Sequence, residues 1–218
     1  MPENPPPVRR RKAARPAELL AAALEVFVDK GFAAAPVEAI ARRAGVSKAT
    51  VFLYFPSKEA LFEAVVTEAV LPRIAQGEAL LADLADPACA LEAALRYFWQ
   101  TVGEGRLAGI PKLVLAEAGN FPQLAQFYFD HVVLRCRAAL CRALQAGMAA
   151  GVFRPGNVEV LAQLAVAPLL FNSMWRQAMQ ACDPQQPSGD DYFNTHLANY
   201  MRGLRVVPDA AVSTKGQV

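Results

Sequence analysis

Histidine is almost absent from this sequence, which has only His131 and His196 among its 218 residues. The two fall in different predicted helices, and we expect each to face solvent or to form a hydrogen bond rather than to act in catalysis. The sequence also has no glycine-rich phosphate loop and no closely spaced set of metal ligands. We therefore expect a protein that is not an enzyme and that uses no cofactor and no metal ion.

Cysteine is scarce as well, and the spacing of the four residues does not suit a zinc site. No apolar stretch follows the basic run near the N-terminus, so this segment does not have the pattern of a secretory signal. The longest uncharged run, residues 160–175, holds sixteen residues and is too short and too polar for a membrane span. We expect a buried helix there, a cytoplasmic protein, and reduced core thiols at Cys89, Cys136, Cys141 and Cys182.

Charged residues make up only 19% of the chain and the net charge is +2, whereas hydrophobic residues make up 54%. This balance is typical of a globular protein. The charge is unevenly distributed, because residues 1–58 hold ten Lys or Arg and five Asp or Glu, a net +5, and the rest of the chain carries −3. A basic first quarter followed by an acidic remainder indicates an anionic partner at one end of the chain.

Alanine and leucine dominate the sequence and helical spacing recurs almost everywhere, while the alternation typical of strands is missing. We therefore predict an all-α fold of about nine helices. The first helices are predicted at 16–30 and 37–44, then after Ser47 and after Ser57, two serines that can cap helices. The remaining helices are predicted at 86–102, 107–118, 121–151, 157–181 and 190–205.

The segment 37–55 has the spacing of a helix-turn-helix motif. Ala41 provides the small side chain that two steeply crossing helices need, and Gly45 tolerates the positive φ of the turn that follows. Val51 can then pack back onto the first helix, where Ile40 and Val46 complete a small core. Ala41, Gly45 and Val51 at this spacing are together a more specific signal than any one of them alone.

The outward side of the second helix of this motif carries groups that suit DNA. Lys48 can donate to guanine or phosphate, Thr50 can bond to a base or a phosphate, and Leu53 can touch a thymine methyl group. Lys58 begins the next helix, where backbone N–H groups and the helix dipole favour an anion. The predicted DNA-binding residues are Ser47, Lys48, Ala49, Thr50, Phe52, Leu53, Tyr54 and Lys58.

The run from residue 14 to residue 64 resembles the N-terminal domain of TetR-family transcriptional regulators. The resemblance is carried by Gly31-Phe32, Val37, Ile40-Ala41, Ala44-Gly45-Val46-Ser47-Lys48, Tyr54-Phe55, Ser57-Lys58-Glu59 and Leu61-Phe62. It implies an all-helical homodimer whose three-helix DNA-binding domain is joined to a larger helical domain. The predicted division is a flexible basic arm at 1–14, the helix-turn-helix DNA-binding domain at 15–62, a ligand-binding and dimerisation domain at 63–206 and a flexible tail at 207–218.

Two positions depart from the family pattern. Ala35-Pro36 stands where the family has a hydroxyl residue that caps the second helix, and the missing capping oxygen costs about 1 kcal/mol. Phe52 stands where tyrosine is common, and it cannot donate a hydroxyl to a phosphate. We therefore expect Lys48, Tyr54, Lys58 and the arginines of the arm to contribute more of the backbone binding.

The resemblance continues more weakly over residues 112–125, KLVLAEAGNFPQLA, which are similar to a subgroup often associated with efflux or stress control. This similarity implies a repressor that responds to a small apolar molecule. Aromatic residues of the second domain could line its cavity, although each alone is more often ordinary core. The candidate ligand-binding residues are Phe98, Trp99, Glu117, Phe127, Met148, Phe171 and Trp175, with Arg96 a further polar candidate.

The expected function is that of a homodimeric regulator that binds a near-palindromic double-stranded DNA operator, is released from it by a small-molecule effector, and has no membrane partner. The last two long helices are expected to form the dimer contact, using Leu161, Leu164 and Leu169. Two alternatives stay open. One is an architectural DNA-binding protein without an effector, and the other is an all-helical enzyme that uses His131, Asp130 or Glu117.

Overall fold

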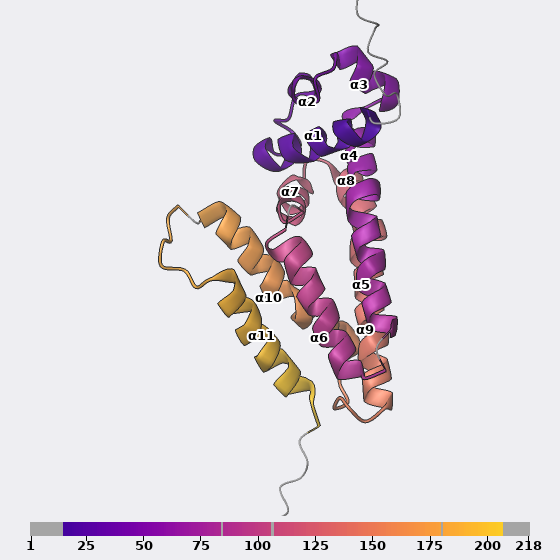
Figure 1. Cartoon of the computed structure of the whole chain (residues 1–218), viewed down its shortest axis with the longest axis vertical. Helices are drawn as coiled ribbons and strands as arrows, with labels where there is room; N and C mark the ends of the chain where they lie inside the picture. Colours follow the sequence, from indigo (N-terminus) through magenta and orange to yellow (C-terminus); the bar gives the residue numbers. More distant parts are fainter. Residues whose placement is uncertain (1–14, 84, 106, 180, 207–218) are drawn as a thin grey trace, which may run out of the picture. The chain divides into compact units, whose positions relative to one another are not determined.

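The computed structural model describes residues 15–83, 85–105, 107–179 and 181–206, and Figure 1 shows them as helices joined by loops. These residues form eleven α-helices, three π-helical segments and no strand, apart from an isolated bridge between Phe153 and Arg205. The α-helices are α1 (Arg15–Lys30), α2 (Val37–Arg43), α3 (Lys48–Tyr54), α4 (Lys58–Val65), α5 (Leu71–Asp83), α6 (Pro87–Phe98), α7 (Gly109–Glu117), α8 (Pro122–Tyr128), α9 (Leu134–Ala149), α10 (Val158–Met179) and α11 (Gly189–Leu204). The π-helical segments are η1 (Val66–Val70), η2 (Trp99–Gly103) and η3 (Phe129–Val133).

Several of these elements follow one another without a break. Residues 58–83 run through α4, η1 and α5, residues 87–103 through α6 and η2, and residues 122–149 through α8, η3 and α9. Counted in this way the described chain has nine continuous helices, which confirms the predicted all-α fold. The π-helical segments, in which backbone hydrogen bonds reach five residues back instead of four, were not predicted.

Polar side chains cap the helices at the predicted positions. Backbone N–H groups of the first turn donate to Ser47 at the start of α3, to Ser57 at the start of α4 and to Asp86 at the start of α6. Asn157 accepts from two backbone N–H groups of α10, at 3.0 and 3.3 Å. Helix α2 follows Pro36 and has no side-chain cap. Among the described residues, no other side chain replaces the capping hydroxyl that the sequence lacks at this position.

The chain folds into two compact units. The first unit contains the described residues up to Val70 together with the distant segment Leu113–Phe127. The second contains Leu71–Lys112 and the described residues from Tyr128 onward. Helix α7 therefore begins in the second unit and ends in the first, and the segment 113–127, which the sequence places in the second domain, packs with the first.

The core of the first unit is built around Phe32. Its ring centroid lies 5.5 Å from that of Phe27 and 5.9 Å from that of Phe62. The ring of Phe121, which comes from the loop after α7, lies edge-on to Phe32 at 4.8 Å. Aromatic pairs in such tilted arrangements add to the stabilisation from burial, so the distant segment 113–127 completes the core of this unit.

The helix-turn-helix has the small core that its sequence predicts. Ile40 and Ala41 of α2 and Val51 of α3 are buried, and Gly45 in the turn has a φ of +66°. The backbone N–H of Val46 donates to the carbonyl of Ala41 at 2.9 Å, which closes the turn. The predicted motif is therefore confirmed in its backbone and in its packing.

The core of the second unit is formed by α6, α9, α10 and α11. The indole of Trp99 stacks on the ring of Phe193 with the centroids 5.8 Å apart. Arg135 of α9 binds Glu78 of α5 through both carboxylate oxygens, at 2.9 and 2.6 Å. The buried side chains of this core include Leu91, Leu95, Leu144, Leu169 and Leu204.

Helix α10 buries only one of its faces, although a buried helix was predicted. Among the described residues it is the one helix that is long and apolar enough to cross a membrane by length and composition, but only 22% of its most apolar stretch is buried. Ala165 and Leu169 face the core of the unit, so the predicted dimer role of Leu169 is wrong, whereas Leu164 is exposed. The exposed apolar side chains of this helix are Val160, Leu164, Phe171, Trp175 and Met179.

The four cysteines are free thiols, but only two of them are partly shielded from solvent. Cys89 and Cys182 are exposed, which corrects the expectation of core thiols, while Cys136 and Cys141 are half-buried. Burial raises the pKa of Cys136 to about 11, and the hydrogen bond from Cys89 to Asp86 raises the pKa of that thiol. Thiols with raised pKa values stay protonated at neutral pH and are poor nucleophiles.

Candidate functional site

Helix α3 buries one side and offers the other to solvent. On its inner side Val51 is buried. Lys48, Ala49 and Leu53 are exposed, and Thr50 and Tyr54 are half-buried. Leu53 is 80% exposed, more than any other large hydrophobic residue in the described part of the chain. An apolar side chain held in water on a short helix has no role in the core, and this makes the outer side of α3 a candidate contact surface.

The start of α3 is fixed by hydroxyl groups. The Oγ of Ser47 accepts from the backbone N–H of Thr50 at 3.1 Å, and the two hydroxyls of these residues lie 2.8 Å apart. Thr50 keeps lone pairs and its methyl group for another partner, because a hydroxyl can both donate and accept. The predicted capping role of Ser47 is confirmed, and its role as a DNA contact stays a prediction.

Lys48 has an acidic partner in the DNA-free chain. Its ammonium lies 2.6 Å from the carboxylate of Glu38 on α2 and 5.7 Å from the ring centroid of Phe52. The hydrogen bond from Lys48 lowers the pKa of Glu38 below its ordinary value. Both side chains are about half exposed, so a phosphate or base edge can compete with Glu38 for this ammonium.

Lys58 is directed toward the protein backbone. Its ammonium donates to the carbonyls of Phe32, Ala33 and Ala35 at 2.8, 3.2 and 3.4 Å, and lies 4.7 Å from the ring centroid of Phe32. It thereby holds the loop between α1 and α2. The predicted phosphate contact stays a prediction, and it would require the ammonium to exchange these carbonyls for a phosphate.

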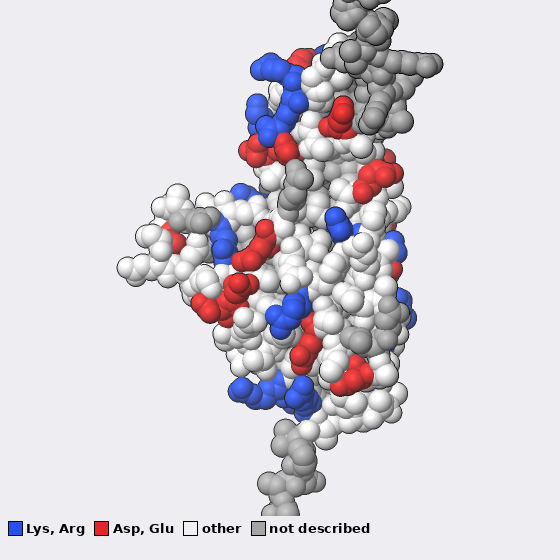
Figure 2. Space-filling model, viewed as in Figure 1, with Lys and Arg blue, Asp and Glu red and all other residues white. Residues whose placement is uncertain are grey.

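Basic groups of α2 extend the surface around α3. Figure 2 shows Lys and Arg side chains gathered over this helix, whose last turn carries the exposed Arg42 and Arg43. Arg43 also pairs with Glu25 of α1. Sequence reasoning did not select these arginines, although their position just before the turn of the motif is the signal that could have found them. The arginines of the predicted basic arm lie outside the described residues.

Glu117 serves the first unit, which corrects its place among the candidate ligand-binding residues. Its side chain is only 8% exposed, and its Oε1 accepts from the backbone N–H of Ala33 at 2.8 Å. Oε2 accepts from the side-chain amide of Asn120 at 3.4 Å. The carboxylate therefore binds the loop between α1 and α2 that Lys58 also binds.

The seven candidate ligand-binding residues are divided between the two units. Phe127 belongs to the first unit with Glu117, whereas Phe98, Trp99 and Met148 belong to the second unit. Phe171 and Trp175 lie next to each other on α10 but are 59% and 42% exposed, which suits a partner surface better than a cavity wall. The other polar candidate, Arg96, is exposed and lies over the ring of Phe193.

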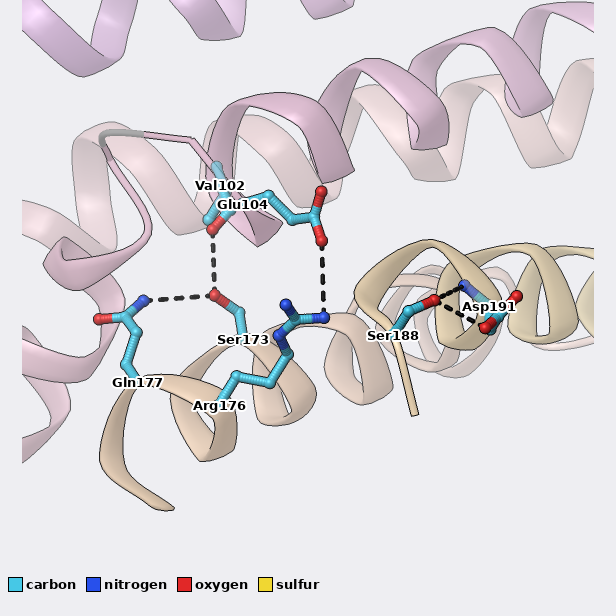
Figure 3. Close-up of polar contacts among 7 residues, drawn as sticks. All are labelled: Val102, Glu104, Ser173, Arg176, Gln177, Ser188 and Asp191. Atoms are coloured by element: carbon cyan, nitrogen blue, oxygen red, sulfur yellow. Dashed lines mark hydrogen bonds and ion pairs between the residues drawn. The ribbon is translucent and has the colours of Figure 1, made fainter. Parts of the chain in front are cut away.

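A polar cluster that sequence reasoning missed lies where η2 meets α10. Ser173 donates to the carbonyl of Val102 at 3.2 Å, Gln177 donates to Ser173 at 3.5 Å, and Arg176 pairs with Glu104 at 3.5 Å (Figure 3). Three buried polar atoms on these two elements have no hydrogen-bond partner in the described chain. They are Nε1 of Trp99, Oδ1 of Asn172 and Nη1 of Arg176.

The sequence matches two family models. Residues 19–65 match the model described as bacterial regulatory proteins of the tetR family, and residues 89–199, more than half of the chain, match the C-terminal domain of AefR-like transcriptional repressors. The chain is also 46% identical over 59 residues to the HTH-type transcriptional regulator RutR of Escherichia coli. That match covers 27% of this chain and 28% of RutR, so the chain spans less than a third of the length of this relative.

Solved structures with the same fold extend over nearly the whole chain. A TetR-family regulator from Mesorhizobium loti superposes with a TM-score of 0.69 at 24% identity, covering 91% of this chain and 100% of that one. FadR of Bacillus subtilis in complex with stearoyl-CoA superposes with a TM-score of 0.67 at 19% identity, covering 86% and 98%. These structures show the fold, and the family models over residues 19–65 and 89–199 show the family: the chain belongs to the TetR family of bacterial regulatory proteins.

Proposed function

We propose that this protein is a cytoplasmic, homodimeric repressor that α3 anchors to a near-palindromic operator and that a small apolar molecule releases. The observation that carries the proposal is the outer side of α3, where Leu53 is 80% exposed beside the exposed Lys48 and Ala49. Family membership supports a regulatory role. The complex of FadR with stearoyl-CoA supports an apolar effector, although that ligand is a property of FadR.

In the proposed complex the N-terminal part of α3 enters the major groove. Lys48, Thr50 and Leu53 face base edges, since their ammonium, hydroxyl and methyl groups match acceptors and thymine methyl groups there. The remaining predicted residues lie along the phosphate backbone, where contacts fix the register but carry no sequence information. These are Ser47, Ala49, Phe52, Tyr54 and Lys58, joined by Arg42 of α2.

The proposed dimer contact is the exposed side of α10. Val160, Leu164, Phe171 and Trp175 leave a row of apolar side chains in solvent along this helix. A contiguous apolar surface of this kind is typical of a protein interface, and a two-fold axis lets the same row cover itself. Two α3 helices in such a dimer would read half-sites about 34–36 Å apart, one turn of the double helix.

The operator contact can be tested with two exposed leucines of the first unit. DNA selected from a random library by the full-length protein should yield a near-palindromic site, and Leu53→Ala should weaken binding to that site by about tenfold. Leu115→Ala is the matched control, because Leu115 is 65% exposed on α7 and lies outside the proposed surface. Equal operator affinity of L53A and L115A would refute the placement of α3 in the groove.

The dimer contact can be tested in the same way on α10. Leu164→Glu places a charge in the middle of the apolar row and should convert the dimer to a monomer in sedimentation velocity experiments. Leu115→Glu should remain dimeric. Because a monomer binds only one half-site, L164E should also lose most of its operator affinity. A dimeric L164E would place the interface elsewhere.

A further inference from the structure

We propose that the junction of η2 and α10 recognises the polar head of the effector, and that this head is a hydrogen-bond-accepting oxygen of a carboxylate or a carbonyl group. The inference rests on the proposed effector-responsive function and adds the chemical class of the ligand. The inference is argued from three polar side chains of this junction, those of Trp99, Asn172 and Arg176.

The three side chains belong to two elements that are held together, because α10 binds the end of η2. The ring of Trp99 lies against the backbone of Gly103, where an added Cβ would collide with the indole. The residues on either side of Gly103 are the ones that α10 binds, since Ser173 donates to the carbonyl of Val102 and Arg176 pairs with Glu104 (Figure 3). The Trp99 ring and the head group of Arg176 therefore contact neighbouring residues of the chain, Gly103 and Glu104.

The donors at this junction are buried and unused. Trp99 is 2% exposed, and its indole N–H has no partner among the described residues. An indole N–H can only donate, so its partner must be an acceptor. A buried donor without a partner is unfavourable, so the group calls for an explanation, and a bound acceptor would supply one.

Arg176 supplies a second donor with a positive charge. Its Nη1 is buried without a hydrogen bond, because the nearest carboxylate oxygen, that of Glu104, is 3.5 Å away. A charge-assisted hydrogen bond between such groups is usually about 2.7–2.9 Å long. The guanidinium therefore retains the capacity to bind an acceptor that approaches more closely than Glu104 does.

Asn172 completes the set one helical turn before Arg176, on the same side of α10. Its Oδ1 is buried and has no partner. The two ends of the side-chain amide are assigned from their surroundings, so after a flip the same group offers N–H donors. Two N–H donors, one of them cationic, with an adaptable amide beside them fit a carboxylate or a carbonyl oxygen and disfavour an ammonium head group.

Binding at this junction would reach the start of α11. A Cβ added at Gly189, the first residue of that helix, would collide with both Glu104 and Arg176, so the helix packs directly on this ion pair. Any head group that draws the guanidinium from Glu104 must shift atoms that α11 rests on. The junction thus links a buried ligand to a helix beside α10 and its exposed face.

The test uses the full-length protein and three probes with the same ten-carbon chain: decanoate, methyl decanoate and decylammonium. The chain has two tryptophans, so Trp175→Phe leaves Trp99 as the only reporter, and a new hydrogen bond to its N–H should shift its emission to longer wavelength. Decanoate and methyl decanoate should bind saturably and shift the emission, and decylammonium should bind at least tenfold more weakly. Arg176→Gln should raise the Kd of decanoate at least tenfold and that of the uncharged ester less.

Arg202→Gln is the matched control, because Arg202 is an exposed arginine in the last turn of α11. It should leave every Kd unchanged. The proposal is overturned if neither decanoate nor methyl decanoate binds, if decylammonium binds as well as decanoate, or if R176Q and R202Q bind decanoate equally. Operator binding by the ligand-free protein is measured separately. If the ligand predictions fail while the protein still binds its operator, only the proposed ligand class is refuted. If the protein binds no operator, the proposed function is refuted.

Discussion

The carboxylate of Glu117, the last residue of α7, accepts a 2.8 Å hydrogen bond from the backbone N–H of Ala33, 84 positions earlier in the chain. Gly31, two residues before Ala33, has a φ of +80°, and a Cβ there would lie 3.4 Å from the same carboxylate oxygen. The loop that precedes α2 is thus shaped around one buried carboxylate. Because α7 begins in the second unit and ends in the first, this bond ties the DNA-binding helices to a segment that both units share.

Glu117→Ala should loosen this loop. Removing the carboxylate leaves the N–H of Ala33 without its acceptor, which should cost about 1.5–3 kcal/mol of unfolding free energy. The amide of Ala33 should exchange with solvent faster in hydrogen-exchange experiments, and operator affinity should fall because α2 supports α3. Asn120→Ala is the control, because it removes only the 3.4 Å contact to the other carboxylate oxygen. Unchanged exchange at Ala33 in E117A would contradict this role.

Glu38 should restrain the DNA-binding lysine. Since the carboxylate of Glu38 lies 2.6 Å from Lys48, the ammonium must leave it to bind DNA. Glu38→Gln should therefore tighten operator binding by about two- to fivefold, the modest effect expected of an exposed pair. Lys48→Ala should weaken it by about tenfold. Titrations in parallel at two salt concentrations provide the measurement, and weaker binding by E38Q would show that the pair assists the complex.

Lys58→Met distinguishes the two roles of this lysine. Since its ammonium donates to three loop carbonyls, we expect the substitution to lower the free energy of unfolding by about 1–3 kcal/mol. Since Lys58 also lies along the phosphate backbone in the proposed complex, the substitution should lower the slope of log K against log salt for operator binding by about one unit. An unchanged slope would show that Lys58 only holds the loop.

Gly45→Ala should show how much the motif depends on the backbone of its turn. Nothing lies within 4 Å of an added Cβ at this position, so the cost arises from the φ of +66° and not from crowding. A left-handed residue with a side chain costs about 1–2 kcal/mol. Gly119→Ala has the same open surroundings without the positive φ and should be nearly neutral in thermal unfolding. Equal stability of the two variants would contradict this account of the turn.

The pair between Arg135 and Glu78 should make stability depend on pH. The hydrogen bond from Arg135 lowers the pKa of Glu78 below its ordinary value of 4.5. A lowered carboxyl pKa stabilises the folded state above the ordinary pKa, and this contribution is lost as the pH falls through the lowered one. Glu78→Gln should therefore cost about 1 kcal/mol at pH 7, since the pair is partly exposed, and progressively less below pH 4.5 in urea denaturation.

Glu92→Gln is the control for that experiment. Glu92 also pairs with an arginine, Arg205, but through a single longer contact of 3.4 Å with both side chains more exposed. Its substitution should change the unfolding free energy little at any pH. If the difference in unfolding free energy between wild type and E78Q stays constant from pH 7 to low pH, the pair between Arg135 and Glu78 does not cause the pH dependence.

The DNA-binding motif could be predicted because each of its signals depends on residues a few positions apart in the sequence. Ser47 and Ser57 cap helices within their own first turns, Gly45 supplies a backbone conformation, and Ala41 and Val51 meet across a short turn. Hydrophobic spacing predicted the nine continuous helices for the same reason. Such features depend on separations of a few residues, which a sequence shows directly.

Features that depend on distant packing could not be predicted in this way. No pattern in the sequence indicated that Phe121 packs on Phe32 or that Glu117 binds Ala33, because partners 84 or more residues apart leave no periodic signal. Lys58 stood at a helix start that suits an anion, yet three carbonyls from one loop hold its ammonium. The polar residues of α10 were likewise hidden within an apolar run, although they gather at the end of η2.

As the proposed dimer contact, the uncovered side of α10 would also tie the lifetime of the protein to its abundance. A newly made chain would expose Val160, Leu164 and Phe171 to chaperones and proteases until a second copy covers them. At low copy number that meeting would be slow, so the unpaired chain would be degraded soon after synthesis, whereas at higher copy number the proposed dimer would form and persist. A cell could therefore adjust the amount of active regulator by small changes in the expression of its gene.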